Sequence, residues 1–186
     1  IVSIFDSQGL RAHDVIQYPE FYSTSSMARF QTISSGIIPK ISLIMGPCTG
    51  DLSIIAALGD FVFMVRDTSY MHLMSTPSGA TNQEIGDAWD VHANLTGCCH
   101  VFVDNEDECL LKCKQLLGYL PQNNMEKPPV VDTGDDPDRR EEELLELVPI
   151  DSSKPYSMYK MISLIVDKGE FFEIRRYWAR NLITGF

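Results

Sequence analysis

The sequence predicts an α/β fold with a mainly parallel sheet, and two observations support this prediction. Three apolar runs at 1–7, 41–45 and 60–65 have the length and the β-branched or aromatic composition of buried strands. Segments of helical character at 14–35 and 51–59 separate them. Strands that alternate with helices in this way are joined by right-handed crossovers, so neighbouring strands are expected to be parallel.

Further elements are expected after the third strand. A short helix is predicted over 82–90 and another apolar strand over 98–104. Leucine and cysteine residues at helical spacing predict a helix over 106–120, with Asp104 or Asn105 as its N-cap. Together these elements extend the alternating pattern of the first sixty residues.

The composition changes after residue 120. Residues 121–140 are polar, rich in proline and aspartate, and have no apolar period, which predicts an extended linker on the surface. Beyond it, apolar residues between 156 and 166 keep helical spacing, while 170–178 and 181–186 alternate as strands do. These last elements are expected to open a second domain.

Charge and composition narrow the possible functions. Hydrophobic residues make up 44% and charged residues 22%, which is typical of globular proteins. The net charge of −11 would repel a phosphate backbone, so contact with nucleic acid is not expected. No apolar run is long enough to span a membrane. The chain starts with Ile1 rather than methionine, which suggests a processed chain or a piece of a longer one.

The five cysteines do not form a metal or disulfide pattern. Cys98, Cys99 and His100, with Cys109 and Cys113, match no zinc ribbon or finger spacing. Cys109 and Cys113 lie four residues apart on an apolar helix face, as packed cysteines do. We therefore expect no bound metal, and a reducing compartment.

Several segments together resemble one protein family. They read SSGIIPKISLIMGPCTG, DFVFMVRDTSYM, DNEDECL, VPIDSSKPYSMYKMISLIVDKGEFFEI and ARNLITGF. They resemble the carboxyltransferase (β) subunits of biotin-dependent acyl-CoA carboxylases, most closely those of the propionyl-CoA carboxylases. The resemblance runs from Ile1 to Phe186 and covers only the middle part of such a subunit.

The resemblance implies a crotonase-like (ClpP/crotonase) fold, a twisted sheet with flanking helices that occurs twice in tandem. Residues 1–120 would be the remainder of the N-terminal carboxyltransferase-like domain, 121–146 an extended, acidic and proline-rich linker, and 147–186 the start of the C-terminal one. In this family the N-terminal domain holds acyl-CoA, and the C-terminal domain of a neighbouring subunit holds carboxybiotin. Backbone N–H groups stabilise the enolate through which the carboxyl group is transferred.

The first acyl-CoA loop implied by the resemblance keeps Gly9 and a substrate-binding Arg11. Gln8 and Leu10 replace a glycine and an alanine of the family pattern. Glycine at such a position lets the backbone approach a ligand closely, so the two side chains are expected to enter that space. In the alternative, the Gln8 side chain lies on a solvent-facing turn and does not interfere with ligand binding.

In the second loop Gly50 is kept, and Asp51 replaces its partner glycine. The start of a helix favours an anion, so Asp51 is expected to act as an N-cap whose carboxylate accepts the first-turn amides. It would then repel an enolate about 4 Å away by roughly 4 kcal/mol at an effective dielectric constant of 20.

A third segment, after Tyr70, is shorter than in the family and has Gly86–Asp87 in place of a glycine pair. His100 matches a family histidine and is a second substrate-binding candidate.

Three altered loops around one site favour a degenerate carboxyltransferase, which keeps its fold and serves as a non-catalytic structural subunit of a larger assembly. The assembly would lie in the mitochondrial matrix or another reducing compartment, with other protein subunits as partners. The alternative is an active enzyme that transfers a carboxyl group from carboxybiotin to propionyl-CoA or a similar acyl-CoA. A third possibility is a module that binds CoA through Arg11 without turnover. No cofactor is expected to be covalently bound; biotin on a partner, and acyl-CoA, belong only to the active alternative.

Overall fold

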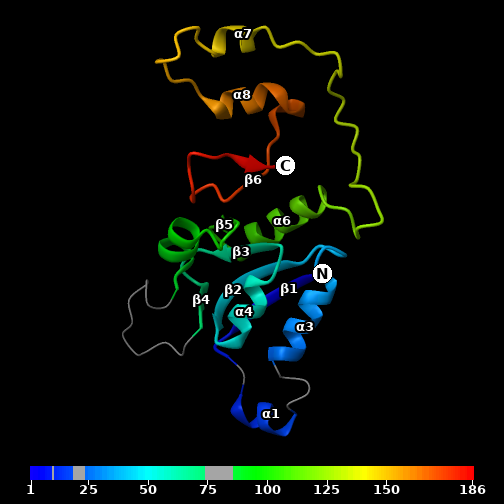
Figure 1. The fold of residues 1–186 in the computed structure, drawn as a ribbon, viewed down its shortest axis with the longest axis vertical. Helices are drawn as coiled ribbons and strands as arrows, with labels where there is room; N and C mark the ends of the chain where they lie inside the picture. The colour runs from blue at the N-terminus through cyan, green and yellow to red at the C-terminus, as the bar shows by residue number, and fades with distance from the viewer. Residues whose placement is uncertain (10, 19–23, 74–85) are drawn as a thin grey trace.

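The computed structural model describes residues 1–9, 11–18, 24–73 and 86–186 (Figure 1). Its centre is a five-stranded sheet in which every pairing is parallel. Four strands follow the order β1 (Val2–Ser7), β2 (Ile41–Thr49), β3 (Phe61–Val65) and β5 (Val101–Val103), and β4 (Tyr70–His72) pairs with β2. The predicted α/β fold with a parallel sheet is confirmed.

The central strand β2 is buried along most of its length, which explains its near-continuous apolar sequence. Successive side chains point to opposite faces, and both faces are covered. Leu43 and Phe63 lie in one core cluster with residues of α6 (Glu106–Leu117), while Ile44 and Met64 lie in another with residues of α4 (Asp51–Ala57). The sheet is therefore the middle layer between helices.

Strand β2 is longer than the sequence indicates. A turn was expected from Gly46, but the strand continues to Thr49 because β4 pairs in parallel with its last three residues. The backbone amide of Gly50 then donates to the carbonyl oxygen of His72 at 2.8 Å. The carboxyl ends of β2 and β4 thus lie side by side.

The helices follow the prediction with local differences. The helix expected over 14–35 is two helices, α1 (Ala12–Gln17) and α3 (Thr24–Ser34), and residues 19–23 lie outside the described part. The helix expected over 82–90 begins at Ala88 as the π-helix η1 (Ala88–Thr96), and 82–85 also lie outside the described part. Asn105 caps α6 as predicted, since its side chain accepts from the amide of Glu108 at 2.9 Å.

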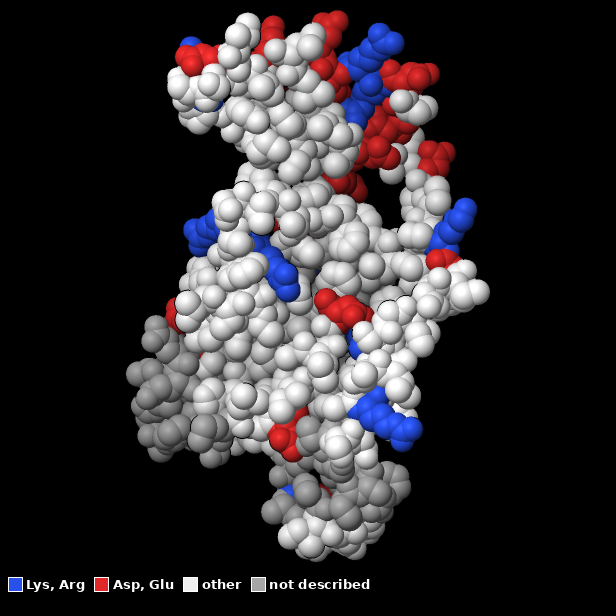
Figure 2. All heavy atoms as spheres, viewed as in Figure 1, with Lys and Arg blue, Asp and Glu red and all other residues white. Residues whose placement is uncertain are grey.

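After α6 the chain contains little regular structure. Residues 121–142 contain no helix or strand, as expected, and lead to α7 (Glu143–Leu147), α8 (Met158–Ile165) and the 3₁₀ turn η2 (Asp167–Gly169). Figure 1 shows α7 and α8 at one end of the molecule, away from β1 to β4. In the same view acidic side chains crowd this end (Figure 2).

The chain then returns to the sheet through a short antiparallel pair, β6 (Glu173–Ile174) and β7 (Thr184–Gly185). Phe172 is only 3% exposed and belongs to the same core cluster as Leu43 and Phe63. The end of the chain therefore packs against the main sheet, and the division at residues 120 and 147 stays a prediction.

The cysteines are free and packed, as predicted. Cys48, Cys99, Cys109 and Cys113 are buried, and Cys98 is half-buried. Burial raises the pKa of the Cys48 and Cys109 thiols to about 12, so these side chains are protonated at neutral pH. Within the described residues no cluster of His, Cys, Asp and Glu is arranged to hold a metal, and no helix there is both long and apolar enough to cross a bilayer.

Candidate functional site

Two loops meet at the carboxyl ends of β1 and β2, where parallel sheets commonly bind ligands. Ser7, at the end of β1, lies opposite Cys48 of β2. The Thr49 hydroxyl donates to the carbonyl oxygen of Gln8 at 2.5 Å and so joins the two loops. The sheet therefore brings together the two glycine loops that the sequence singled out.

The glycines predicted at this site have backbone conformations that suit glycine. Gly9 has φ 127° and Gly50 has φ 64°, both in the region that side chains disfavour. A Cβ atom added to Gly50 would meet nothing within 4 Å. Gly50 is therefore required by the turn rather than by crowding, and the space beside its backbone is open.

Hydroxyl groups fix the first loop. The Ser7 hydroxyl donates to the carbonyl oxygen of Gly9 at 2.9 Å and accepts from its amide at 3.3 Å. Thr49, which holds the neighbouring carbonyl of Gln8, is 6% exposed. The Gln8 side chain is exposed, and the backbone φ of Gln8 is not positive. Both observations are consistent with the alternative in which Gln8 lies on a solvent-facing turn. Leu10 lies outside the described residues.

The predicted capping role of Asp51 is wrong. Gly50 is the N-cap residue of α4, with φ 64° and ψ −140°, and Asp51 is the first helical residue. No side-chain hydrogen bond caps this helix. The reason is the backbone of Gly50, which takes the non-helical conformation that an N-cap needs and moves Asp51 one position into the helix. The Asp51 side chain is exposed.

Asp87, in the other altered glycine pair, does cap a helix, although not α4. Its carboxylate accepts from the amides of Trp89 at 2.8 Å and Asp90 at 2.9 Å, at the start of η1. Gly86 before it has φ 68°, and an added Cβ would lie 2.0 Å from the carbonyl oxygen of Met71. The altered pair Gly86–Asp87 therefore has a structural role, which the sequence analysis missed although Asp is a common N-cap. Residues 74–85 of this segment lie outside the described part.

The two substrate-binding candidates are placed differently. Arg11 is exposed, two residues beyond Gly9, and precedes α1. His100 precedes β5, and its Nδ1 accepts from the amide of Val62 at 2.9 Å. Val62 pairs with Ser42, seven residues before Thr49, so His100 is roughly 23 Å from the glycine loops along the strand direction. The structure keeps Arg11 on the side of the glycine loops and puts His100 at the opposite, amino edge of the sheet.

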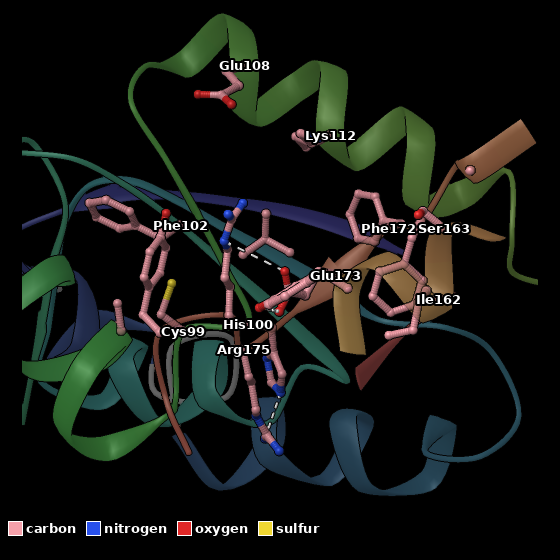
Figure 3. A pocket seen from close by; sticks show the side chains of 17 residues that line it. Cys99, His100, Phe102, Glu108, Lys112, Ile162, Ser163, Phe172, Glu173 and Arg175 are labelled. Atoms are coloured by element: carbon pink, nitrogen blue, oxygen red, sulfur yellow. Dashed lines mark hydrogen bonds and ion pairs between the residues drawn. The ribbon is translucent and has the colours of Figure 1, made fainter. Parts of the chain in front are cut away.

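A cavity of about 440 Å³ opens beside His100 (Figure 3). Its walls come from the segment before β5, from α6, from α8 and from the residues around β6. Burial, with the charge of Arg175, lowers the pKa of His100 to about 4, so the imidazole is neutral at pH 7. This cavity could not be predicted from the sequence, because the residues that line it lie between Ala93 and Tyr177 and come together only in the folded chain.

Comparison with known proteins is consistent with the resemblance noted above. A profile of the carboxyl transferase domain matches residues 1–186. The α subunit of methylmalonyl-CoA decarboxylase from Veillonella parvula is 40% identical over 193 residues, covering all of this chain and 37% of that protein. The mitochondrial propionyl-CoA carboxylase β chain of Homo sapiens is 35% identical over 193 residues, again with all of this chain covered and 35% of the relative.

Solved structures agree with these relatives. A transcarboxylase 12S crystal structure with methylmalonyl-CoA and methylmalonic acid bound matches with a TM-score of 0.90 and 32% identity, covering all of this chain and 36% of the other. The β subunit of P. aeruginosa geranyl-CoA carboxylase matches over all of this chain and 35% of its own with a TM-score of 0.58 and 25% identity. The chain spans little more than a third of the length of these proteins.

Proposed function

Because this chain belongs to the carboxyl transferase domain family, we propose that it forms the acyl-CoA side of a biotin-dependent acyl-CoA carboxyltransferase. The relatives named for propionyl-CoA and methylmalonyl-CoA support a short acyl thioester as substrate. The transcarboxylase 12S structures, described as a hexamer assembly with substrate bound, support a multi-subunit enzyme.

The observation that carries this proposal is the pair of left-handed glycines at adjoining strand ends. Gly9 and Gly50 turn the backbone where β1 and β2 finish, and Thr49 holds the two loops together. The open space beside Gly50 suits a thioester carbonyl. A backbone amide that donates to a developing oxyanion contributes about 3–4 kcal/mol in known enzymes.

The chemistry assigned to these loops is stabilisation of an enolate. The α-carbon of the acyl thioester loses a proton, and the negative charge moves to the thioester oxygen, which accepts hydrogen bonds from the loop amides. Carboxyl transfer to the α-carbon would then need carboxybiotin, and the proton released from the α-carbon would end on the biotin nitrogen that gives up the carboxyl group. Carboxybiotin, carried by a partner subunit, would supply the carboxyl group; the residues described in this chain contribute the thioester side.

The substitutions at Gln8 and Asp51 leave the proposed donors in place. An oxyanion hole uses backbone N–H groups, and every residue except proline carries one. The charge of Asp51 matters more, because it lies near the proposed anion. Its side chain is exposed, however, and two like charges 4 Å apart repel by about 1 kcal/mol in water against 4 kcal/mol at a dielectric constant of 20. The repulsion between Asp51 and the enolate is then smaller than the stabilisation that one backbone amide gives the enolate.

A non-catalytic structural subunit is the second candidate, and the two departures from the family pattern at Gln8 and Asp51 favour it. A protein of this kind would keep its fold and its partners but neither bind acyl-CoA nor labilise its α-proton. A mitochondrial location is likewise a proposal, supported by relatives named as mitochondrial, while Veillonella parvula and Haloferax mediterranei proteins are 40% and 38% identical, against 35% for the human mitochondrial chain.

Exchange of the propionyl-CoA α-protons in D₂O tests the proposal directly, together with calorimetric binding of the same compound. We expect exchange by the purified protein and at least a tenfold decrease in Gly50→Ala. Gly36→Ala is the matched control, because Gly36 also has a positive φ of 72° and open space around it but precedes β2 at the other edge of the sheet. The two glycines have similar φ angles and lie at opposite edges of the sheet, so the control tests whether position matters.

The alternatives give different results in the same assay. Binding without exchange would indicate the CoA-binding module, and neither binding nor exchange would indicate the structural subunit. Asp51→Asn measures the charge effect, with Asp107→Asn as control since Asp107 also lies in a first helical turn. A rise of a few fold in exchange is expected only for Asp51→Asn. A rise of a hundredfold would show that Asp51 suppresses the reaction.

A further inference from the structure

The cavity at the amino edge of the sheet is large enough to hold a small ligand. Its volume of about 440 Å³ lies in the range of small-molecule sites. Figure 3 shows Lys112 projecting from α6 on one side and Arg175, beside His100, on the other, with Ile162 of α8 at a third side. The distance from the glycine loops makes this a different place from the proposed acyl-CoA site.

Two cations of this cavity have no carboxylate partner. Among the described residues, neither Lys112 nor Arg175 lies within 4.0 Å of an acidic group, whereas Arg66, Arg139 and Lys160 each form ion pairs. The Lys112 ammonium lies 5.6 Å from the centre of the Phe172 ring.

The contact between Arg175 and His100 strengthens this point. A neutral imidazole carries one proton, and Nδ1 accepts from the Val62 amide, so the proton lies on Nε2. Nη2 of Arg175 is 2.8 Å from this Nε2, which places two donors against each other. Nε of Arg175 donates to the carbonyl oxygen of Gly97 at 3.1 Å, but Nη2 faces a donor and not an acceptor, and an oxygen atom of a bound anion would provide one. The φ of Arg175 is 55°, an uncommon conformation of the kind that occurs at functional sites.

The carboxylates of the same cavity are already engaged. Glu108 accepts from the amide of Asp104 at 2.9 Å, and Glu173 accepts from the Tyr159 hydroxyl at 2.7 Å. Glu173 also lies 3.7 Å from Arg176. The carboxylates are thus engaged within the protein, whereas Lys112 and Arg175 have only neutral acceptors, the Gln115 side chain at 3.5 Å and the Gly97 carbonyl oxygen at 3.1 Å. The cavity therefore favours an anionic ligand.

Apolar side chains complete the walls. Ile162 and Phe171 line the cavity and are half-buried, so they offer surface that a ligand would remove from water. We propose that this cavity binds a small organic anion, whose charged group lies between Lys112 and Arg175 and whose apolar body lies against Ile162 and Phe171. The site does not depend on the proposed carboxyltransferase function.

The probe that tests this is 8-anilinonaphthalene-1-sulfonate, compared with N-phenyl-1-naphthylamine, which has the same rings without the sulfonate. Fluorescence titration of the purified protein should show the sulfonate binding at least tenfold more tightly than the neutral amine. Equal affinities would overturn the anion assignment, because general apolar surface would then explain the binding.

Variants locate the binding. Lys112→Gln should weaken sulfonate binding five- to tenfold and leave the neutral amine unchanged, while Lys114→Gln, on the same helix but outside the cavity, should change neither. Ser163→Phe fills the cavity from α8 and should abolish tight binding. Circular dichroism confirms that each variant is folded. Sulfonate binding that Lys112→Gln and Ser163→Phe leave intact would place the probe elsewhere and overturn the proposal.

Discussion

The two edges of the central sheet are built from different interactions. At the carboxyl edge, backbone turns at Gly9 and Gly50 and hydroxyl hydrogen bonds from Ser7 and Thr49 fix two short loops. At the amino edge, side chains from four separate segments surround a cavity with unpaired positive charge. The edges share the same strands but few local contacts, so each should respond to its own set of substitutions.

The largest effect on stability is expected in the core, which packs against the strands that both edges share. Phe63 of β3 is fully buried, and Phe63→Ala should lower the free energy of unfolding by about 3–5 kcal/mol through lost burial and the cavity left behind. Urea denaturation measures this. Ile165→Ala on α8 is the control, because Ile165 is 61% exposed and should change stability by less than about 0.5 kcal/mol. A small effect at Phe63 would show that the edges are stabilised independently.

The amino edge should lose stability in acid through His100. Its pKa is lowered from 6.5 to about 4 in the folded protein, so between these pH values the unfolded chain binds a proton that the folded chain does not. Stability should therefore fall by roughly 2–3 kcal/mol as the pH decreases across this range. His100→Asn, which keeps an acceptor for the Val62 amide, should flatten the decline seen in thermal unfolding. A decline that His100→Asn leaves unchanged would refute the assignment.

The carboxyl edge should be sensitive to Thr49. Thr49→Val keeps the shape but removes the hydroxyl that holds the Gln8 carbonyl, at a cost of about 1–2 kcal/mol. Propionyl-CoA α-proton exchange should fall several-fold further in Thr49→Val than in Ser69→Ala. Ser69→Ala is the control because it loses a comparable buried hydrogen bond, of 2.6 Å to the Val65 carbonyl oxygen, away from the two loops. Thr49→Ser should restore exchange, and sulfonate binding at the other edge should be unchanged in all three variants. Loss of both activities in Thr49→Val would mean that the edges are coupled.

The smallest effect is expected from Arg139, whose contacts join the linker to α8, one wall of the cavity. We call these contacts the clasp. Arg139 donates to the carbonyl oxygens of Leu164 and Val166 and pairs with Asp135 and Glu141. Arg139→Gln should increase proteolysis of the linker two- to fivefold and weaken sulfonate binding slightly, without changing propionyl-CoA exchange. Arg140→Gln, the exposed neighbour, serves as control. Equal proteolysis of the two variants would show that the clasp does not hold the linker.

Much of the fold and part of the site could be predicted because the signals are local. Alternating apolar and helical segments predicted the parallel sheet, and the place before an amphipathic helix narrowed its cap to Asp104 or Asn105, of which the structure shows Asn105. Gly9 and Gly50 were identified through the family resemblance, and their positive φ values are consistent with a need for glycine. The position of Asp51 was misjudged by one residue, because the sequence does not reveal which neighbour leaves the helical conformation.

The sequence by itself determined the main strands and helices, the family and the two glycine loops, since each is recognised from short stretches of the chain. Only the tertiary structure decided that His100 lies at the far edge from these loops, that Asp87 is a cap, and that Phe172 returns to the core. It alone brought Lys112 and Arg175 to one cavity. The physical reason is that strand register and long-range packing, rather than local propensity, determine which distant charges meet and which remain without a partner.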